Sequence, residues 1–303
     1  MAELGLGLQG LEKVEPSVQG QSPKPQFLLY PVLMALSVLV VIALGAFVTS
    51  RANANQLNWH PIVNGAFHRL VATGVGVLGV WLAFWLAETR EAPVLGWAAL
   101  ACFLVNGCLG WLGGSVVVLH ATLAPVVFGS FVSILVVTSA GWKQAPELVA
   151  PQPAFLRRLV FAAPVLLVLQ TLLGATYRHK LTSVLPHIGF AMIVTVVTLA
   201  GSVLIVQHYP KHRALRPAAI WMMLALGTQV ALGFATLTMQ VLERGSSFAL
   251  ALVISSAVHV VVGSITMAAS FVLALQVQRH VRPSLGLTAE KPAEVPLMAQ
   301  KDH

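Results

Sequence analysis

Charged residues are scarce in this sequence. Only 9% of its 303 residues are Asp, Glu, Lys or Arg, whereas 57% are hydrophobic and the mean hydropathy is +0.83. A soluble domain carries about 25% charged residues. The composition therefore excludes a soluble globular protein and predicts an all-α integral membrane protein.

The sequence has only two cysteines and no signal-peptide pattern at its start. The two cysteines, Cys102 and Cys108, cannot form a disulfide scaffold, and we expect both to be small, buried, apolar residues. The first 26 residues lack the basic, then apolar, then small-residue pattern of a cleaved signal peptide. We expect residues 1–26 to be a disordered cytoplasmic tail.

Long apolar runs are what the sequence does have. A spanning helix needs about 20 apolar residues. Eight such runs occur, near 27–49, 63–87, 93–112, 116–140, 157–177, 183–207, 217–241 and 249–277. We therefore predict eight transmembrane helices in two pseudo-repeated four-helix bundles. The first bundle is expected over 27–142, a cytoplasmic linker over 143–156, the second bundle over 157–280 and a second tail over 281–303.

The Lys and Arg residues are distributed unevenly between the two sides of these spans. Thirteen fall on the side of the termini and five on the other side, and Lys and Arg favour cytoplasmic loops. We therefore expect both termini to be cytoplasmic, in a membrane of the bacterial inner type. This topology accounts for the net charge of +8, so we expect a lipid bilayer and no nucleic acid as partner. The outer five are Arg51, Arg69, Arg178, Lys180 and Arg244.

The spans repeat as helical hairpins. The first helix of each hairpin carries a Leu-Gly pair near its outer end, and the second carries one histidine there. The glycines are Gly45, Gly110, Gly174 and Gly233, and the histidines are His68, His120, His187 and His259. From 20 to 24 residues separate each histidine from the next cytoplasmic charge, or about 30 to 36 Å of helix. The four imidazoles are therefore expected at nearly one depth, close to the outer surface.

Four histidines at one depth suggest bound haem. Haem iron takes axial imidazole ligands, so two histidines on facing helices can hold one haem, and four imply one site in each half. The outer cations Arg69, Arg178, Lys180 and Arg244 would serve the haem propionates. The alternatives are neutral histidines that bond to backbone carbonyls, or a zinc or copper site, for which no carboxylate or thiolate lies nearby.

Several short motifs, in order, resemble the heme A synthase family. They are the "HR" of the second span, "LHATLA", "LQTLLGATYRH" leading into "LPHIGFA", and "TQVALG" before the last histidine, over roughly residues 27–280. The resemblance implies an enzyme that oxidises the C8 methyl of heme O to the formyl of heme A for cytochrome oxidase. By resemblance, His187 and His259 would ligate a heme b cofactor, while His68 and His120 would flank heme O and its iron as catalytic residues.

One departure from the family keeps a second function open. The family pattern has a glutamate three residues before the histidine of "HR", where this chain has Gly65. If the chain is a synthase, His60 or Asn64 could take over proton transfer. The alternative is a non-catalytic bis-histidine b-type haem protein, either an electron carrier or a haem-holding assembly factor. Heme O synthase or oxidase assembly proteins are the expected partners, and the sequence leaves a homo-oligomer open.

Overall fold

The prediction of an all-α membrane protein with eight spanning helices is confirmed. The computed structural model describes residues 26–53, 65–144, 148–152, 154–242 and 249–283. Within these residues, eight helices are long and apolar enough to cross a membrane. They are α1 (Gln26–Asn53), α2 (Gly65–Thr89), α3 (Pro93–Leu112), α4 (Val117–Thr138), α6 (Ala154–Arg178), α7 (Leu185–His208), α8 (Leu215–Leu242) and α9 (Ala249–His280). The predicted tails lie almost entirely outside the described residues.

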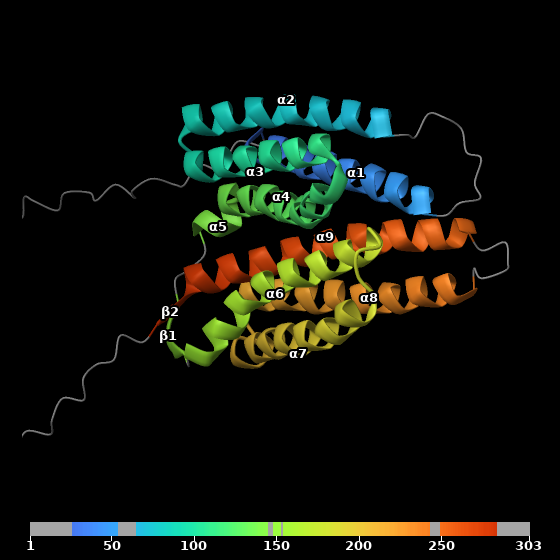
Figure 1. Ribbon diagram of the computed structural model, residues 1–303. Helices are drawn as coiled ribbons and strands as arrows, with labels where there is room; N and C mark the ends of the chain where they lie inside the picture. The colour runs from blue at the N-terminus through green and yellow to red at the C-terminus, as the bar shows by residue number, and fades with distance from the viewer. Residues whose placement is uncertain (1–25, 54–64, 145–147, 153, 243–248, 284–303) are drawn as a thin grey trace, which may run out of the picture.

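The helices pack as two rings of four. In the first ring α1 contacts α2, α2 contacts α3, α3 contacts α4, and α4 returns to α1. In the second ring α6, α7, α8 and α9 follow one another in the same way. Figure 1 shows the rings as two layers joined through α9, which lies along both α1 and α4. Helices α2 and α4 therefore stand at opposite corners of one ring, and α7 and α9 at opposite corners of the other.

Short elements connect the spanning helices. The tight turn expected between the third and fourth spans is present, with Gly113 and Gly114 at φ of 64° and 59° before a 3-10 turn, η1 (Gly114–Val116). Glycine adopts such positive φ angles without steric cost. At the opposite end, α5 (Ala140–Gln144) follows α4, and β1 (Leu148–Gln152) pairs in parallel with β2 (Val281–Pro283). This strand pair was not predicted.

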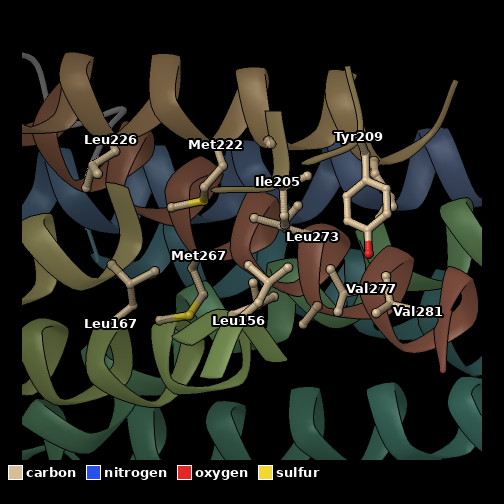
Figure 2. Packing of buried hydrophobic residues seen from close by; sticks show 14 of the residues in the cluster. Leu156, Leu167, Ile205, Tyr209, Met222, Leu226, Met267, Leu273, Val277 and Val281 are labelled. Carbon is tan, nitrogen blue, oxygen red and sulfur yellow. The ribbon is translucent and has the colours of Figure 1, made fainter. Parts of the chain in front are cut away.

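Each ring has its own apolar interior. Figure 2 shows that of the second ring, with Ile205 of α7, Met222 of α8 and Met267 of α9 packed together and at most 1% exposed. Large apolar side chains on the outside of the helices, such as Leu70 at 70% and Trp221 at 68%, are exposed as expected for lipid contact. Cys108 is also exposed, so the prediction that it is buried is wrong. Its side of α3 does not face a neighbouring helix.

Candidate functional site

The four span histidines meet as two pairs, one at the centre of each ring of helices. His68 on α2 and His120 on α4 have ring centroids 6.4 Å apart and ring planes at 79°. His187 on α7 and His259 on α9 also have centroids 6.4 Å apart, with planes at 85°. In each ring the two histidines come from opposite corners, so their side chains face each other across the bundle axis.

Each histidine ring packs against the Leu-Gly glycine of the preceding helix. A Cβ built on Gly45 would lie 2.9 Å from Cε1 of His68, and one on Gly110 would lie 2.8 Å from Cε1 of His120. The corresponding distances are 2.9 Å from Gly174 to His187 and 3.3 Å from Gly233 to His259. The glycine and the histidine of every hairpin therefore form one contact, in which a larger residue would displace the imidazole at Gly45, Gly110 and Gly174 and crowd it at Gly233.

A backbone carbonyl one helical turn before the glycine holds two of the rings. Nδ1 of His120 lies 2.8 Å from the carbonyl oxygen of Asn106, and Nδ1 of His187 lies 3.2 Å from that of Gln170. Because a carbonyl can only accept, Nδ1 of His120 carries the proton and its Nε2 keeps its lone pair, the tautomer that suits a metal ligand. Nδ1 of His187 also lies 3.0 Å from the amide nitrogen of Gln170, which can only donate, so its contacts assign no single tautomer.

The other two rings are held less tightly. The backbone at Val41 interacts with His68 and that at Gln229 with His259, but within the described residues neither Nδ1 has a hydrogen-bond partner of regular geometry. Nε2 of His259 instead lies 3.2 Å from the side-chain Nε2 of Gln229. In each pair, one histidine is fixed by a backbone carbonyl and its partner is held mainly by packing.

Two glutamine side chains, for which the sequence predicts no role, contact the histidines of the second pair. Nε2 of Gln170 donates to the carbonyl oxygen of His187 at 2.9 Å and lies 3.0 Å from its Nδ1. The amide of Gln229 lies over Gly263, where a Cβ would be 3.0 Å from the amide nitrogen. Gln170 and Gln229 each precede the ring-contacting glycine by four residues, and this spacing was visible in the sequence.

The predicted propionate cations lie in different surroundings. Arg178 donates from Nη2 to the carbonyl oxygen of Ala46 and, at 2.6 Å, to Oγ of Ser50, both on α1 of the other ring. Arg69 is exposed and lies 5.9 Å from the ring centroid of Trp111. Lys180 is exposed, just beyond the end of α6, with φ at 61°. Arg244, the fourth, lies outside the described residues.

His179 is a further titratable group at this end of the bundle. It follows α6 directly, outside the spanning segment. Burial lowers the pKa of His179, and the nearby Arg178 and His120 lower it further, which favours the neutral imidazole. His60 and Asn64, the expected proton-transfer groups, lie outside the described residues.

Carboxylates are remote from both histidine pairs in the described part of the chain. The acidic residues there are Glu88 and Glu91, at the far end of α2 from His68. A Cβ at Gly65 would meet only Nη2 of Arg69, at 4.0 Å. No group of three or more His, Cys, Asp or Glu residues is close enough to hold a metal ion within these ranges. Each pair thus offers two imidazoles with no carboxylate near them among the described residues.

Comparisons with known proteins assign no family to the chain. No family model, no curated protein and no solved structure matches it. The resemblance to heme A synthases therefore rests on the short motifs alone and stays a prediction.

Proposed function

We propose that the chain is a haem-binding membrane oxidoreductase of the heme A synthase type, with one haem between the histidines of each pair. The observation that carries the proposal is the 6.4 Å spacing of both pairs. Two imidazole nitrogens, each about 2 Å from one metal ion, would place the ring centroids about 6 Å apart. The ring separation of both pairs thus fits two imidazoles that would hold one metal ion between them.

Three further features support haem rather than a bare metal ion. His120 donates from Nδ1 to a backbone carbonyl, which leaves its Nε2 for iron. Two imidazoles with no third His, Cys, Asp or Glu ligand among the described residues match haem, whose porphyrin supplies the other four nitrogens. The outer cations Arg69 and Lys180 lie at the histidine end of the spans, where propionates would need positive charge, while Arg178 at the same end donates to α1.

In the proposed reaction the second pair, His187 and His259, holds a resident heme b, and His68 and His120 hold heme O. Heme b would supply one-electron transfer when bound. Oxidation of the C8 methyl of heme O to a formyl takes up an oxygen atom from water and releases protons and electrons, so the site needs a proton acceptor, and heme b needs an external electron acceptor. His179 is neutral and follows α6 at the histidine end, but burial and Arg178 lower its pKa and so make it a weak proton acceptor.

A non-catalytic bis-histidine haem protein is the second candidate. It is favoured by Gly65, which stands where the family has a glutamate, and by the remoteness of Glu88 and Glu91 from the first pair. The identical spacing of the two pairs also suits two permanent haems. Such a protein would carry electrons or hold haem for oxidase assembly. In either case we place it in a bacterial-type inner membrane with cytoplasmic termini, where heme O synthase and oxidase assembly factors are the proposed partners.

Co-expression with a heme O synthase distinguishes the two functions. Haems extracted from the membranes are separated by chromatography and identified by mass. A synthase yields the hydroxylated intermediate or heme A, and the variant Gly65→Glu should raise the yield because position 65 has room for a side chain. Heme O alone in both proteins would reject the synthase and leave the haem carrier.

A further inference from the structure

Arg178 joins the two rings of helices at their histidine end. It is the last residue of α6, yet its Nη2 donates to the carbonyl oxygen of Ala46 and to Oγ of Ser50 on α1. Ser50 also donates to Ala46, at 2.8 Å, so the three groups close a triangle. Ala46 and Ser50 are 6% and 7% exposed, which places this contact in the interior between the rings.

The electrostatics of this position favour a cation. Arg178 is the last residue of α6, whose carboxyl-terminal end carries partial negative charge from its carbonyl groups. Its guanidinium also meets two oxygen acceptors on α1, the carbonyl of Ala46 and Oγ of Ser50. An ionised group persists within a membrane protein when such partners compensate it. Arg178 is therefore held by α1 and α6 together.

The contact connects to both histidine pairs through neighbouring residues. Ala46 directly follows Gly45, which packs against the ring of His68. Arg178 lies one helical turn beyond Gly174, which packs against the ring of His187. Within the first pair, His68 is the histidine whose Nδ1 has no hydrogen bond of regular geometry to the described residues. The position of its ring thus depends on where the outer end of α1 lies.

We propose that Arg178 is a positioning residue for the first pair: by holding the outer end of α1 against α6, it fixes Gly45 and hence the ring of His68. The second ring of helices thereby completes the site of the first. This role differs from that of a propionate partner in the second pair, and it rests on the haem-binding function proposed above.

The test measures hemin affinity in full-length protein with one pair at a time. In the background H187A/H259A only the first pair can bind, and in H68A/H120A only the second. We expect Arg178→Gln to weaken hemin binding about 10-fold or more in the first background, the usual effect of losing an outer-shell partner, and less than twofold in the second. Ser50→Ala should act in the same direction, and its effect should not add to that of Arg178→Gln.

Ser133→Ala is the matched control. Ser133 is 5% exposed and donates to the carbonyl oxygen of Gly129 at 2.8 Å, as Ser50 does to Ala46, but it lies on α4 away from Arg178. We expect no change in affinity from this variant. If Arg178→Gln weakens hemin binding mainly at the second pair, the positioning role is wrong and Arg178 contacts a propionate instead.

Amide hydrogen exchange gives a readout that needs no haem. Arg178→Gln should speed exchange over residues 45–50, whereas Ser133→Ala should leave it unchanged. If no protein binds hemin but exchange responds as stated, the haem function fails and the contact between the rings stands. If hemin binds and neither affinity nor exchange responds to Arg178→Gln, the inference fails alone.

Discussion

Gly110 lies directly against the imidazole of His120. A Cβ on Gly110 would be 2.8 Å from both Cε1 and Nδ1 of that ring, and Nδ1 is the atom that donates to Asn106. The same glycine-to-histidine contact recurs in the other three hairpins. It explains why a Leu-Gly pair and a histidine occur together four times in the sequence.

Substituting these glycines should displace the rings that they contact. We expect Gly110→Ala to break the bond to Asn106 and to lower hemin affinity at the first pair about 10-fold or more. Gly107→Ala is the control on the same helix, since nothing lies within 4 Å of a Cβ there. It should leave affinity intact and stabilise α3 by about 0.5–1 kcal/mol. Hemin titration of both variants measures the difference, and equal affinities would contradict the steric account.

The size of the effect should follow the distance. Gly174→Ala places a Cβ 2.9 Å from the ring of His187, whereas Gly233→Ala places one 3.3 Å from the ring of His259. We therefore expect Gly233→Ala to lower hemin affinity less than Gly174→Ala does. Gly227→Ala is the control on α8, since nothing lies within 4 Å of a Cβ there. The reverse order would show that the rings are held by something other than these contacts.

Lys180 combines backbone strain with a proposed binding role. Its φ is 61°, a left-handed conformation that costs a non-glycine residue roughly 1–2 kcal/mol. Lys180→Gly should therefore raise the melting temperature of the apoprotein but weaken hemin binding through the lost cation. Arg90→Gly, at φ 56° and at the other end of the bundle, should raise stability without that loss. If both variants bind hemin equally, Lys180 serves no propionate.

The stability of the apoprotein should fall in acid because of His179. Burial, Arg178 and His120 lower the pKa of His179 below its ordinary value of 6.5. The unfolded chain then binds more protons than the folded chain between the lowered pKa and 6.5, so unfolding becomes easier as pH falls through that interval. Melting curves from pH 7 to pH 5 should show a smaller decline for His179→Gln than for the parent. If the melting temperatures of the two proteins decline in parallel, groups other than His179 cause the acid sensitivity.

The side of the membrane that each loop faces can be read by labelling. In a background with Cys102 and Cys108 replaced by Ser, a cysteine at Lys143 or Lys211 should react with an impermeant maleimide only after the cells are opened. A cysteine at Lys180 should react in intact cells. Labelling of Lys211→Cys from outside would reverse the topology predicted from the Lys and Arg distribution.

Much of this arrangement could be predicted because local sequence determines it. Length and hydropathy define the eight spans, and the shared depth of the four histidines placed them near one surface. Spacing along the chain does not say which helices stand at opposite corners of a ring, so it does not identify the partner of each histidine. The prediction of one pair per half matches the pairs His68–His120 and His187–His259 that the structure brings together.

Contacts between the rings could not be predicted from either ring alone. Arg178 was expected at a propionate because of its charge and depth, and the sequence gives no indication that α6 ends beside α1. The pairing of β1 with β2 joins segments more than 120 residues apart, and no alternating apolar pattern in the sequence predicts it. Exposure of Cys108 likewise depends on which face of α3 lacks a neighbour.

The central claim is that each histidine pair binds one haem, and haem stoichiometry tests it most directly. Full-length protein is purified, saturated with hemin and assayed for haem per chain together with its absorption spectrum. We predict two haems with bis-histidine low-spin spectra, one haem in H68A/H120A, one in H187A/H259A, and two in the control His208→Ala, whose histidine is exposed at the opposite end of α7. A protein that binds no hemin, or one whose haem content is unchanged in both double variants, would contradict the account.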